Sequence, residues 1–231
     1  MQYRHLFFDL DHTLWDFDTN SKEALKDLYD INQLHHKGIE HFDDFFERYS
    51  YHNHLLWEKY AKGLIKQDEL RWKRMYLAML DFKFANEKLS RSMGVEFLDI
   101  LPNKNKLFPY TQEILGYLKE KGYMLHLITN GFEKVQQHKL TKSNIDHYFT
   151  EMITSEVSNS LKPNKEIFEY ALNKTGANTT NSIMIGDNLD ADIQGGINAG
   201  LDTVFVNHIN ASTSIEPTYT IFHLKELEQI L

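Results

Sequence analysis

The feature that most constrains the fold of this chain is a series of short apolar segments separated by helical patterns. Each segment has the length of a β-strand and ends in polar or glycine-containing turn residues. The four clearest are residues 3–8, 124–128, 182–185 and 203–206, and a weaker one is 148–153. Because strands that alternate with helices form mostly parallel sheets, this order predicts an α/β fold with helices on both faces of the sheet.

One long segment, residues 16–107, interrupts the alternation with successive amphipathic helical patterns and no strand pattern. One of its apolar stripes consists of Phe42, Phe45, Phe46 and Tyr49. Proline-containing turns near its end mark the return to alternating strands and helices. We therefore predict a catalytic core made of residues 1–15 and 108–231, with a helical insert, residues 16–107, after the first strand.

Composition narrows the classes of partner and chemistry. The net charge of −8, without a basic cluster, argues against a nucleic-acid polymer, although a small anionic ligand needs only local positive charge. The absence of cysteine excludes disulfides, thiolate metal sites and a cysteine nucleophile. No window has the length and apolar character of a membrane span or a signal-peptide core, so we expect a cytoplasmic protein. The sequence makes no prediction of oligomeric state.

Polar residues suited to phosphate and metal chemistry follow the predicted strands. They are Asp9 and Asp11 after the first strand, Thr129-Asn130-Gly131 after the second, Lys162 before Pro163, and Asp187, Asp190 and Asp192 after segment 182–185. Taken alone, each has an ordinary explanation as a turn, a solvated lysine or a helix cap. Ligands of open α/β sheets bind beyond the carboxyl ends of the strands, however, so the four groups together predict one site.

These residue types suit phosphoryl transfer through a covalent intermediate. Asp9 would attack phosphorus and form an aspartyl-phosphate. Asp11 would protonate the leaving oxygen and then take a proton from the water that hydrolyses the intermediate. The remaining phosphoryl oxygens would be held by Lys162, Thr129 and the amides of Asn130 and Gly131. The predicted partner is therefore a small phosphorylated metabolite.

The clustered carboxylates also predict a Mg²⁺ site, because hard cations prefer oxygen ligands. The expected ligands are Asp9, the backbone carbonyl of Asp11, and Asp187. The cation would lower the repulsion between the nucleophile and the phosphoryl group. Without a cation, neighbouring unpaired acids would repel one another and cost stability.

The ordered motifs resemble those of the haloacid dehalogenase-like hydrolase superfamily. The resemblance rests on Asp9-Leu10-Asp11-His12-Thr13, Thr129-Asn130-Gly131, Lys162-Pro163 and Gly186-Asp187 followed by Asp192. It covers nearly the whole chain and implies a Rossmann-like core of five or six strands, a helical cap of the C1 type and the roles given above. It also implies a supporting acid near the metal, for which Asp192 and Asp190 compete.

Finer features resemble the house-cleaning pyrimidine 5′-nucleotidase subgroup of this superfamily. They are the stretch from Phe8 to Asp16, Asn130-Gly131-Phe132 with Val135-Gln136 and Lys139-Leu140, and Gly195-Gly196-Ile197-Asn198-Ala199-Gly200. The subgroup implies a nucleoside 5′-monophosphate as substrate and a cap that supplies selectivity. Trp15, just beyond the catalytic loop, is a candidate substrate contact.

Several alternatives stay open within this resemblance. Asp11 distinguishes the chain from dehalogenases, which lack this acid because a halide leaves without a proton. A sugar-phosphate or phosphoglycolate phosphatase, or a β-phosphoglucomutase-like mutase, would share the core residues and differ in the cap. A phosphonatase would need a cap lysine, for which Lys22, Lys59 and Lys62 are candidates. A catalytically silent sensor of a phosphometabolite would be expected to lack Asp9 or Asp11, and both are present.

Overall fold

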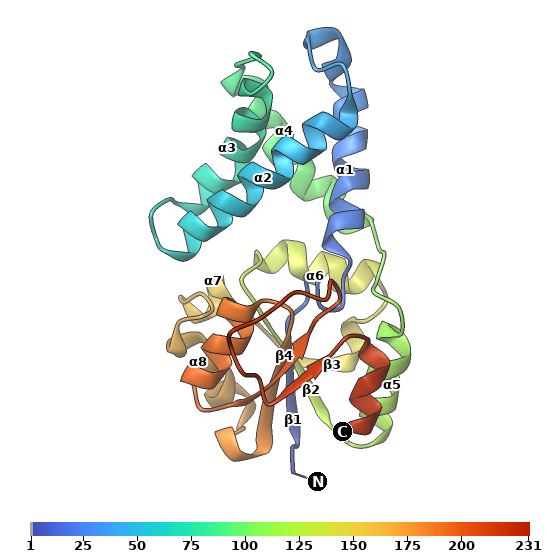
Figure 1. The fold of residues 1–231 in the computed structure, drawn as a ribbon, viewed down its shortest axis with the longest axis vertical. Helices are drawn as coiled ribbons and strands as arrows, with labels where there is room; N and C mark the ends of the chain where they lie inside the picture. Colours follow the sequence, from blue (N-terminus) through green and yellow to red (C-terminus); the bar gives the residue numbers. More distant parts are fainter. Residues whose placement is uncertain (1) are drawn as a thin grey trace. The chain divides into compact units, whose positions relative to one another are not determined.

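The computed structural model describes residues 2–231 and contains a six-stranded sheet in the order β3-β2-β1-β4-β5-β6 (Figure 1). The strands are β1 (His5–Phe8), β2 (Met124–Thr129), β3 (Phe149–Thr154), β4 (Ser182–Gly186), β5 (Asp202–Val206) and β6 (Tyr219–Ile221). Every neighbouring pair is parallel, which confirms the predicted α/β fold. The sequence does not predict β6, because its three residues are too few to show a strand periodicity.

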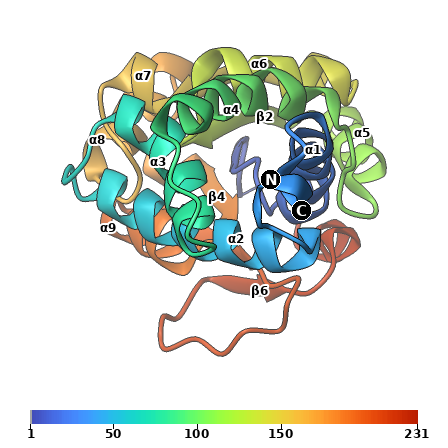
Figure 2. The ribbon, with the colours of Figure 1, turned by 90° about the horizontal axis from the view of Figure 1, so that it is seen from above.

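Helices cover both faces of this sheet. They are α5 (Thr111–Glu120), α6 (Glu133–Lys142), α7 (Ser155–Ser158), α8 (Lys165–Thr175) and α9 (Gly195–Asn198), with a π-helical turn at Leu189–Gln194 and 3₁₀ turns at Asp146–Tyr148, Thr179–Asn181 and Leu224–Gln229. Figure 2 shows α8 and α9 on one side of the sheet and α5 on the other. On the α8 side, the buried core includes Phe7, Ile128 and Met184 of the strands and Ile167, Phe168 and Ala171 of α8. This burial holds the strands, and therefore their carboxyl ends, in a fixed layer.

The strand order changes direction at β1. The chain continues from β1 to β2 on one side, whereas β4 pairs with β1 on the other. In doubly wound sheets, ligands bind in the crevice at such a reversal, beyond the carboxyl ends of the strands. The ends of β1, β2 and β4 are therefore the place where a site is expected.

The described chain divides into two compact units, of which one is the helical unit, Asp18–Lys104. Its elements are α1 (Phe17–Ile31), α2 (Phe42–Ala61), α3 (Gln67–Leu80) and α4 (Glu87–Ile100), with 3₁₀ turns at Leu34–Lys37 and Leu101–Asn103. The rings of Tyr49 and Phe97 lie 5.7 Å apart in its core. The buried Arg74 guanidinium lies 5.0 Å from the Phe97 ring centre and donates to Asn53 Oδ1 at 2.9 Å. Apolar stripes on the helices thus give this unit a core of its own.

The other unit, the core unit, combines the residues up to Phe17 with Asn105–Leu231. Backbone hydrogen bonds join the two segments of the core unit that flank the helical unit in the sequence. Asp16 N donates to Lys106 O at 3.1 Å, and Phe108 N donates to Leu14 O at 2.9 Å. The helical unit, Asp18–Lys104, lies within the predicted insert, residues 16–107, whose bounds stay a prediction. Across residues 2–231, none of the helices has the length and apolar character needed to cross a bilayer.

Candidate active site

The parallel strands bring three of the predicted site residues to one edge of the sheet. Asp9 directly follows β1, and its N–H donates to Ile185 O at 2.9 Å, which extends the pairing of β1 with β4. Asp187 directly follows β4, and Thr129 is the last residue of β2. These residues are far apart in the sequence, and they converge because parallel strands end at the same edge.

Three carboxylates form a compact cluster at this edge. Oxygen atoms of Asp9, Asp187 and Asp192 all lie within 4.8 Å of one another. The Thr13 hydroxyl donates to Asp187 Oδ1 at 2.8 Å and so orients that carboxylate. We call Asp9, Asp187 and Asp192 the acidic cluster.

The structure distinguishes Asp192 from Asp190, the two candidates for the supporting acid near the metal. Asp192 is buried, and its Oδ2 accepts a hydrogen bond from Asn188 N at 3.0 Å. Gly186 leaves room for this carboxylate, because a Cβ on that residue would lie 2.3 Å from Asp192 Oδ2. Asp190 is exposed and lies in the first turn of the π-helical segment Leu189–Gln194. Asp192 is therefore the acid that lies beside Asp9.

Lys162 is a buried cation in contact with the acidic cluster. Its Nζ donates to Asp9 Oδ1 and to Asp192 Oδ1, both at 2.6 Å, and to Ile128 O at 2.7 Å. The side chain of Asn130 holds the Lys162 backbone in place, because its Oδ1 accepts from Lys162 N at 2.8 Å and its Nδ2 donates to Lys162 O at 2.9 Å. The Asn130 side chain thus fixes the loop that carries the lysine.

The charges of the cluster do not balance. Burial raises the pKa of Asp9 well above its usual range, with the Lys162 charge opposing this shift and the Asp192 and Asp187 charges adding to it. Burial and the Asp192 charge raise the pKa of Asp187 to about 7. Burial lowers the pKa of Lys162, but the Asp192 and Asp9 charges outweigh it and leave that pKa raised. Three acids around one ammonium favour either bound protons or a further cation.

The donor set fits Mg²⁺. Its side-chain donors are carboxylate oxygens, the ligands that hard divalent cations prefer, and they are close enough together to share one ion. A divalent cation would also supply the positive charge that the acidic cluster lacks. The contribution of the Asp11 backbone carbonyl to this site stays a prediction.

The carboxylate of Asp11 lies outside the acidic cluster and contacts two side chains of α6. Lys139 Nζ donates to Asp11 Oδ1 at 2.6 Å and to Oδ2 at 2.9 Å, and Gln136 Nε2 donates to Oδ2 at 3.0 Å. Sequence reasoning assigned no role to Gln136 or Lys139. Gln136 and Lys139 are three residues apart, so they lie on one face of a helix. This spacing is the one feature of the sequence that relates them.

The phosphate-binding residues predicted after β2 lie together. Gln136 Nε2 donates to Thr129 Oγ1 at 2.7 Å, and Gly131 N donates to the same oxygen at 3.0 Å. A Cβ on Gly131 would lie 2.2 Å from Gln136 Nε2, so the close approach of the two residues requires glycine. The turn after β2 is therefore closely packed against α6.

Trp15 is fully buried in the structure. Its ring centre lies 4.3 Å from Lys139 Nζ, a cation–π arrangement within the core unit. The structure thus places Trp15 next to the partner of Asp11, and its contact with a substrate stays a prediction.

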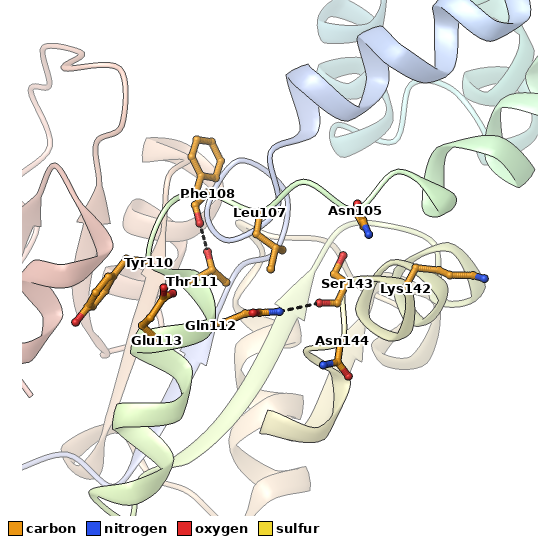
Figure 3. A pocket seen from close by; sticks show the side chains of 10 residues that line it. All are labelled: Asn105, Leu107, Phe108, Tyr110, Thr111, Gln112, Glu113, Lys142, Ser143 and Asn144. Carbon is orange, nitrogen blue, oxygen red and sulfur yellow. Dashed lines mark hydrogen bonds between the residues drawn. The ribbon is translucent and has the colours of Figure 1, made fainter.

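A separate cleft of about 360 Å³ opens between the start of α5 and the end of α6 (Figure 3). Gln112 Nε2 donates to Ser143 O at 3.3 Å, and Thr111 Oγ1 donates to Phe108 O at 2.8 Å within it. None of the predicted site residues is among those that line this cleft. The candidate site at the strand ends is therefore separate from this cleft.

The motifs, the fold and the site agree with a family match. Residues 3–200 match the model of the haloacid dehalogenase-like hydrolase family, so the chain belongs to that family and the predicted resemblance is confirmed. Two relatives are pyrimidine 5′-nucleotidases. PynA of Streptococcus pneumoniae is 31% identical, covering 98% of this chain and 94% of its own length. YjjG of Escherichia coli is 32% identical, and the match covers 100% of this chain and 99% of the length of YjjG. Family and relatives together support the prediction of a phosphoric monoester hydrolase.

A solved structure of high similarity is that of the putative hydrolase YfnB from Bacillus subtilis, bound to magnesium. It is 28% identical, covers 100% of this chain and 99% of its own, and superposes with a TM-score of 0.91. The fold of this chain is thus the fold of a magnesium-binding member of the family.

Proposed function

We propose that this chain is a Mg²⁺-dependent phosphomonoesterase that hydrolyses nucleoside 5′-monophosphates, preferably those of pyrimidines, through an aspartyl-phosphate on Asp9. One observation carries the chemistry: Asp9 follows β1 in contact with the buried Lys162 and beside two further carboxylates. The two nucleotidase relatives, similar over nearly the full length of the chain, support the substrate class.

Asp9 would act as the nucleophile. One of its oxygens attacks phosphorus while the ester oxygen departs, and the phosphoryl group is then attached to the Asp9 carboxylate. The Lys162 ammonium neutralises charge next to the attacking carboxylate. Asp9, the backbone carbonyl of Asp11 and Asp187, with Asp192 in support, would hold Mg²⁺, which would supply positive charge that keeps Asp9 ionised and offsets its repulsion from the phosphate.

Asp11 would serve both halves of the reaction. Its carboxyl group gives a proton to the departing ester oxygen, and its carboxylate then removes a proton from the water that attacks the aspartyl-phosphate. Thr129 Oγ1 and the amides of Asn130 and Gly131 would hold the other phosphoryl oxygens. Asp9 is regenerated when the bond between its oxygen and phosphorus breaks.

The core residues constrain the reaction mechanism more closely than they constrain the substrate. A sugar-phosphate or phosphoglycolate phosphatase, or a β-phosphoglucomutase-like mutase, would use the same core residues. Selection among these substrates would fall to the helical unit, because the strand-end residues contact only the phosphoryl group and its ester oxygen in this mechanism.

The test is phosphate release in the presence of Mg²⁺ from pyrimidine and purine monophosphates, sugar phosphates and phosphoglycolate. We expect kcat/KM to be highest for pyrimidine monophosphates. Asp9→Asn should lower release by about a thousandfold or more, because it removes the nucleophile. Asp190→Asn, a change at an exposed acid of the neighbouring loop, should leave release nearly unchanged.

Release that survives in the Asp9→Asn variant would contradict the mechanism. A preference for another class of phosphate would keep the mechanism and overturn the substrate.

A further inference from the structure

The carboxyl group of Asp11 is held by α6 through three hydrogen bonds. Lys139 Nζ lies 2.6 Å and 2.9 Å from its two oxygens, and Gln136 Nε2 lies 3.0 Å from Oδ2. All three residues belong to the core unit. Both oxygens of Asp11 therefore accept from donors of one helix, and this restricts the rotation of the carboxyl plane.

Lys139 is fixed in this position by its burial. Its side chain is only 3% exposed, and its Nζ lies 4.3 Å from the ring centre of Trp15 and 5.4 Å from that of Phe17. A buried ammonium is costly unless it is paired, and the Asp11 carboxylate supplies this pairing. The aromatic rings limit the movement of the lysine, so the lysine in turn limits the movement of Asp11.

Gln136 connects Asp11 to the turn that follows β2. Its Nε2 donates both to Asp11 Oδ2 at 3.0 Å and to Thr129 Oγ1 at 2.7 Å. Gln136 is fully buried, and Gly131 has no side chain that would displace its amide. One amide group thus sets the distance between the proposed acid–base residue and a proposed phosphate ligand.

We propose that Lys139 and Gln136 are positioning residues that hold the Asp11 carboxyl group where the ester oxygen of the substrate departs. This inference rests on the proposed function, because it assigns them to the proton transfer made by Asp11. For the first transfer the Asp11 carboxyl group must enter the step protonated, and this proton moves to the ester oxygen when the bond between phosphorus and that oxygen breaks. When water attacks the aspartyl-phosphate, a proton of the water moves to the Asp11 carboxylate. Both transfers need the carboxyl group at one defined place.

The discriminating experiment varies the leaving group. An alkyl phosphate, such as uridine 5′-monophosphate, releases an oxygen that needs a proton. p-Nitrophenyl phosphate releases a stabilised phenolate that departs without one. The kcat/KM value reports the steps up to formation of the aspartyl-phosphate, so misplacing the acid lowers it for the alkyl substrate only. The ratio of the two kcat/KM values is independent of the fraction of folded enzyme.

We expect Lys139→Met and Gln136→Leu each to lower the ratio of alkyl to aryl kcat/KM by about 10- to 100-fold, part of the usual contribution of a general acid. Lys139→Arg, which keeps the charge and can donate to both oxygens, should recover part of the loss. Asp11→Asn should lower the ratio at least as much. Lys142→Met and Gln137→Leu, matched changes at exposed positions of α6, should leave the ratio unchanged.

An unchanged or increased ratio in Lys139→Met and Gln136→Leu would overturn the inference, even if both substrates were hydrolysed more slowly. That result would make the two side chains structural only. Failure of the wild-type enzyme to hydrolyse any phosphate monoester would overturn the proposed function, and the inference with it. The two failures are distinguishable, because the wild-type rates are measured in the same experiment.

Discussion

At the scale of single residues, the site depends on buried charges that require one another. Lys162 is 2% exposed, and its two carboxylate partners, Asp9 and Asp192, are 7% and 1% exposed. Burying a charge is tolerated when its partner and hydrogen bonds are in place, but removing one partner leaves the other uncompensated. Burying these charges costs stability, and they lie where they would also serve the proposed phosphoryl transfer.

The stability of the metal-free protein should therefore depend on Lys162. We expect Lys162→Met to lower the free energy of unfolding by about 3–5 kcal/mol, because Asp9 and Asp192 lose their buried counter-charge. The measurement is urea unfolding in the presence of a chelator. Lys165→Met, a change at an exposed lysine paired with Glu169, should have little effect. Equal effects of the two substitutions would show that the buried ion pairs contribute nothing specific.

At the scale of elements, the pairing of β1 with β2 buries two histidines. His5 Nδ1 and His126 Nε2 lie 3.1 Å apart, and the rings stack with their centres 5.3 Å apart. Phe7 lies beside them, with its ring centre 5.0 Å from that of His126. Burial, together with the charges of His5 and Lys119, lowers the pKa of His126 to about 4. Burial also lowers the pKa of His5.

This arrangement should make the sheet sensitive to acid. The folded state keeps His126 neutral down to about pH 4, whereas the unfolded chain takes up a proton near pH 6.5. Stability contributed by the neutral ring is thus present above pH 6.5 and lost as the pH falls towards 4, by about 2–3 kcal/mol. Urea unfolding of His126→Leu between pH 7 and 4 should show a shallower loss than the wild type. His138→Leu, at an exposed site on α6, should follow the wild type, and identical slopes for all three proteins would refute the assignment.

At the scale of the whole molecule, the proposed chemistry is confined to one unit. Asp9, Asp11, Thr129, Lys162, Asp187 and Asp192 all lie in the core unit, whereas the helical unit has its own core. A cation bound to the acidic cluster would therefore join β1 to β4 and stabilise the core unit against unfolding.

Stabilisation by Mg²⁺ should increase with pH. The pKa of Asp187 is raised to about 7 in the metal-free fold, so its contribution to stability is present at low pH and lost as the pH rises through about 7. Because Mg²⁺ bound to the acidic cluster would replace the proton of Asp187, the increase in melting temperature on adding Mg²⁺ should be larger at pH 8 than at pH 6. Saturation at a hundred times Kd corresponds to about 2.7 kcal/mol.

Two matched variants test the metal assignment. Asp192→Asn should reduce the Mg²⁺-dependent increase in melting temperature, and Asp190→Asn should retain it. An equal increase at both pH values, or one that is unaffected by Asp192→Asn, would contradict the assignment of this cluster to the cation.

Much of the fold could be predicted because it depends on the order of apolar segments, turns and helical patterns along the chain. Five strands lie at apolar segments bounded by turns, and their alternation with helices is the signature of a parallel sheet. Strand β6 lacks such a signal, since it pairs by its backbone with β5 over three residues at the edge of the sheet. The positions of Asp9, Thr129 and Asp187 could be predicted for the same reason, because each directly follows or ends a strand.

The sequence by itself determined the α/β fold, the hydrolase family and the strand-end positions of the candidate acids, since each depends on neighbouring residues in the chain. Only the tertiary structure decided that Asp192 rather than Asp190 joins Asp9, because that depends on the path of a π-helical turn. It also decided that Lys139 pairs with Asp11, 128 positions away in the sequence. Helical spacing indicates which side chains share a face, but the residue that such a face meets is set by how helices and strands pack.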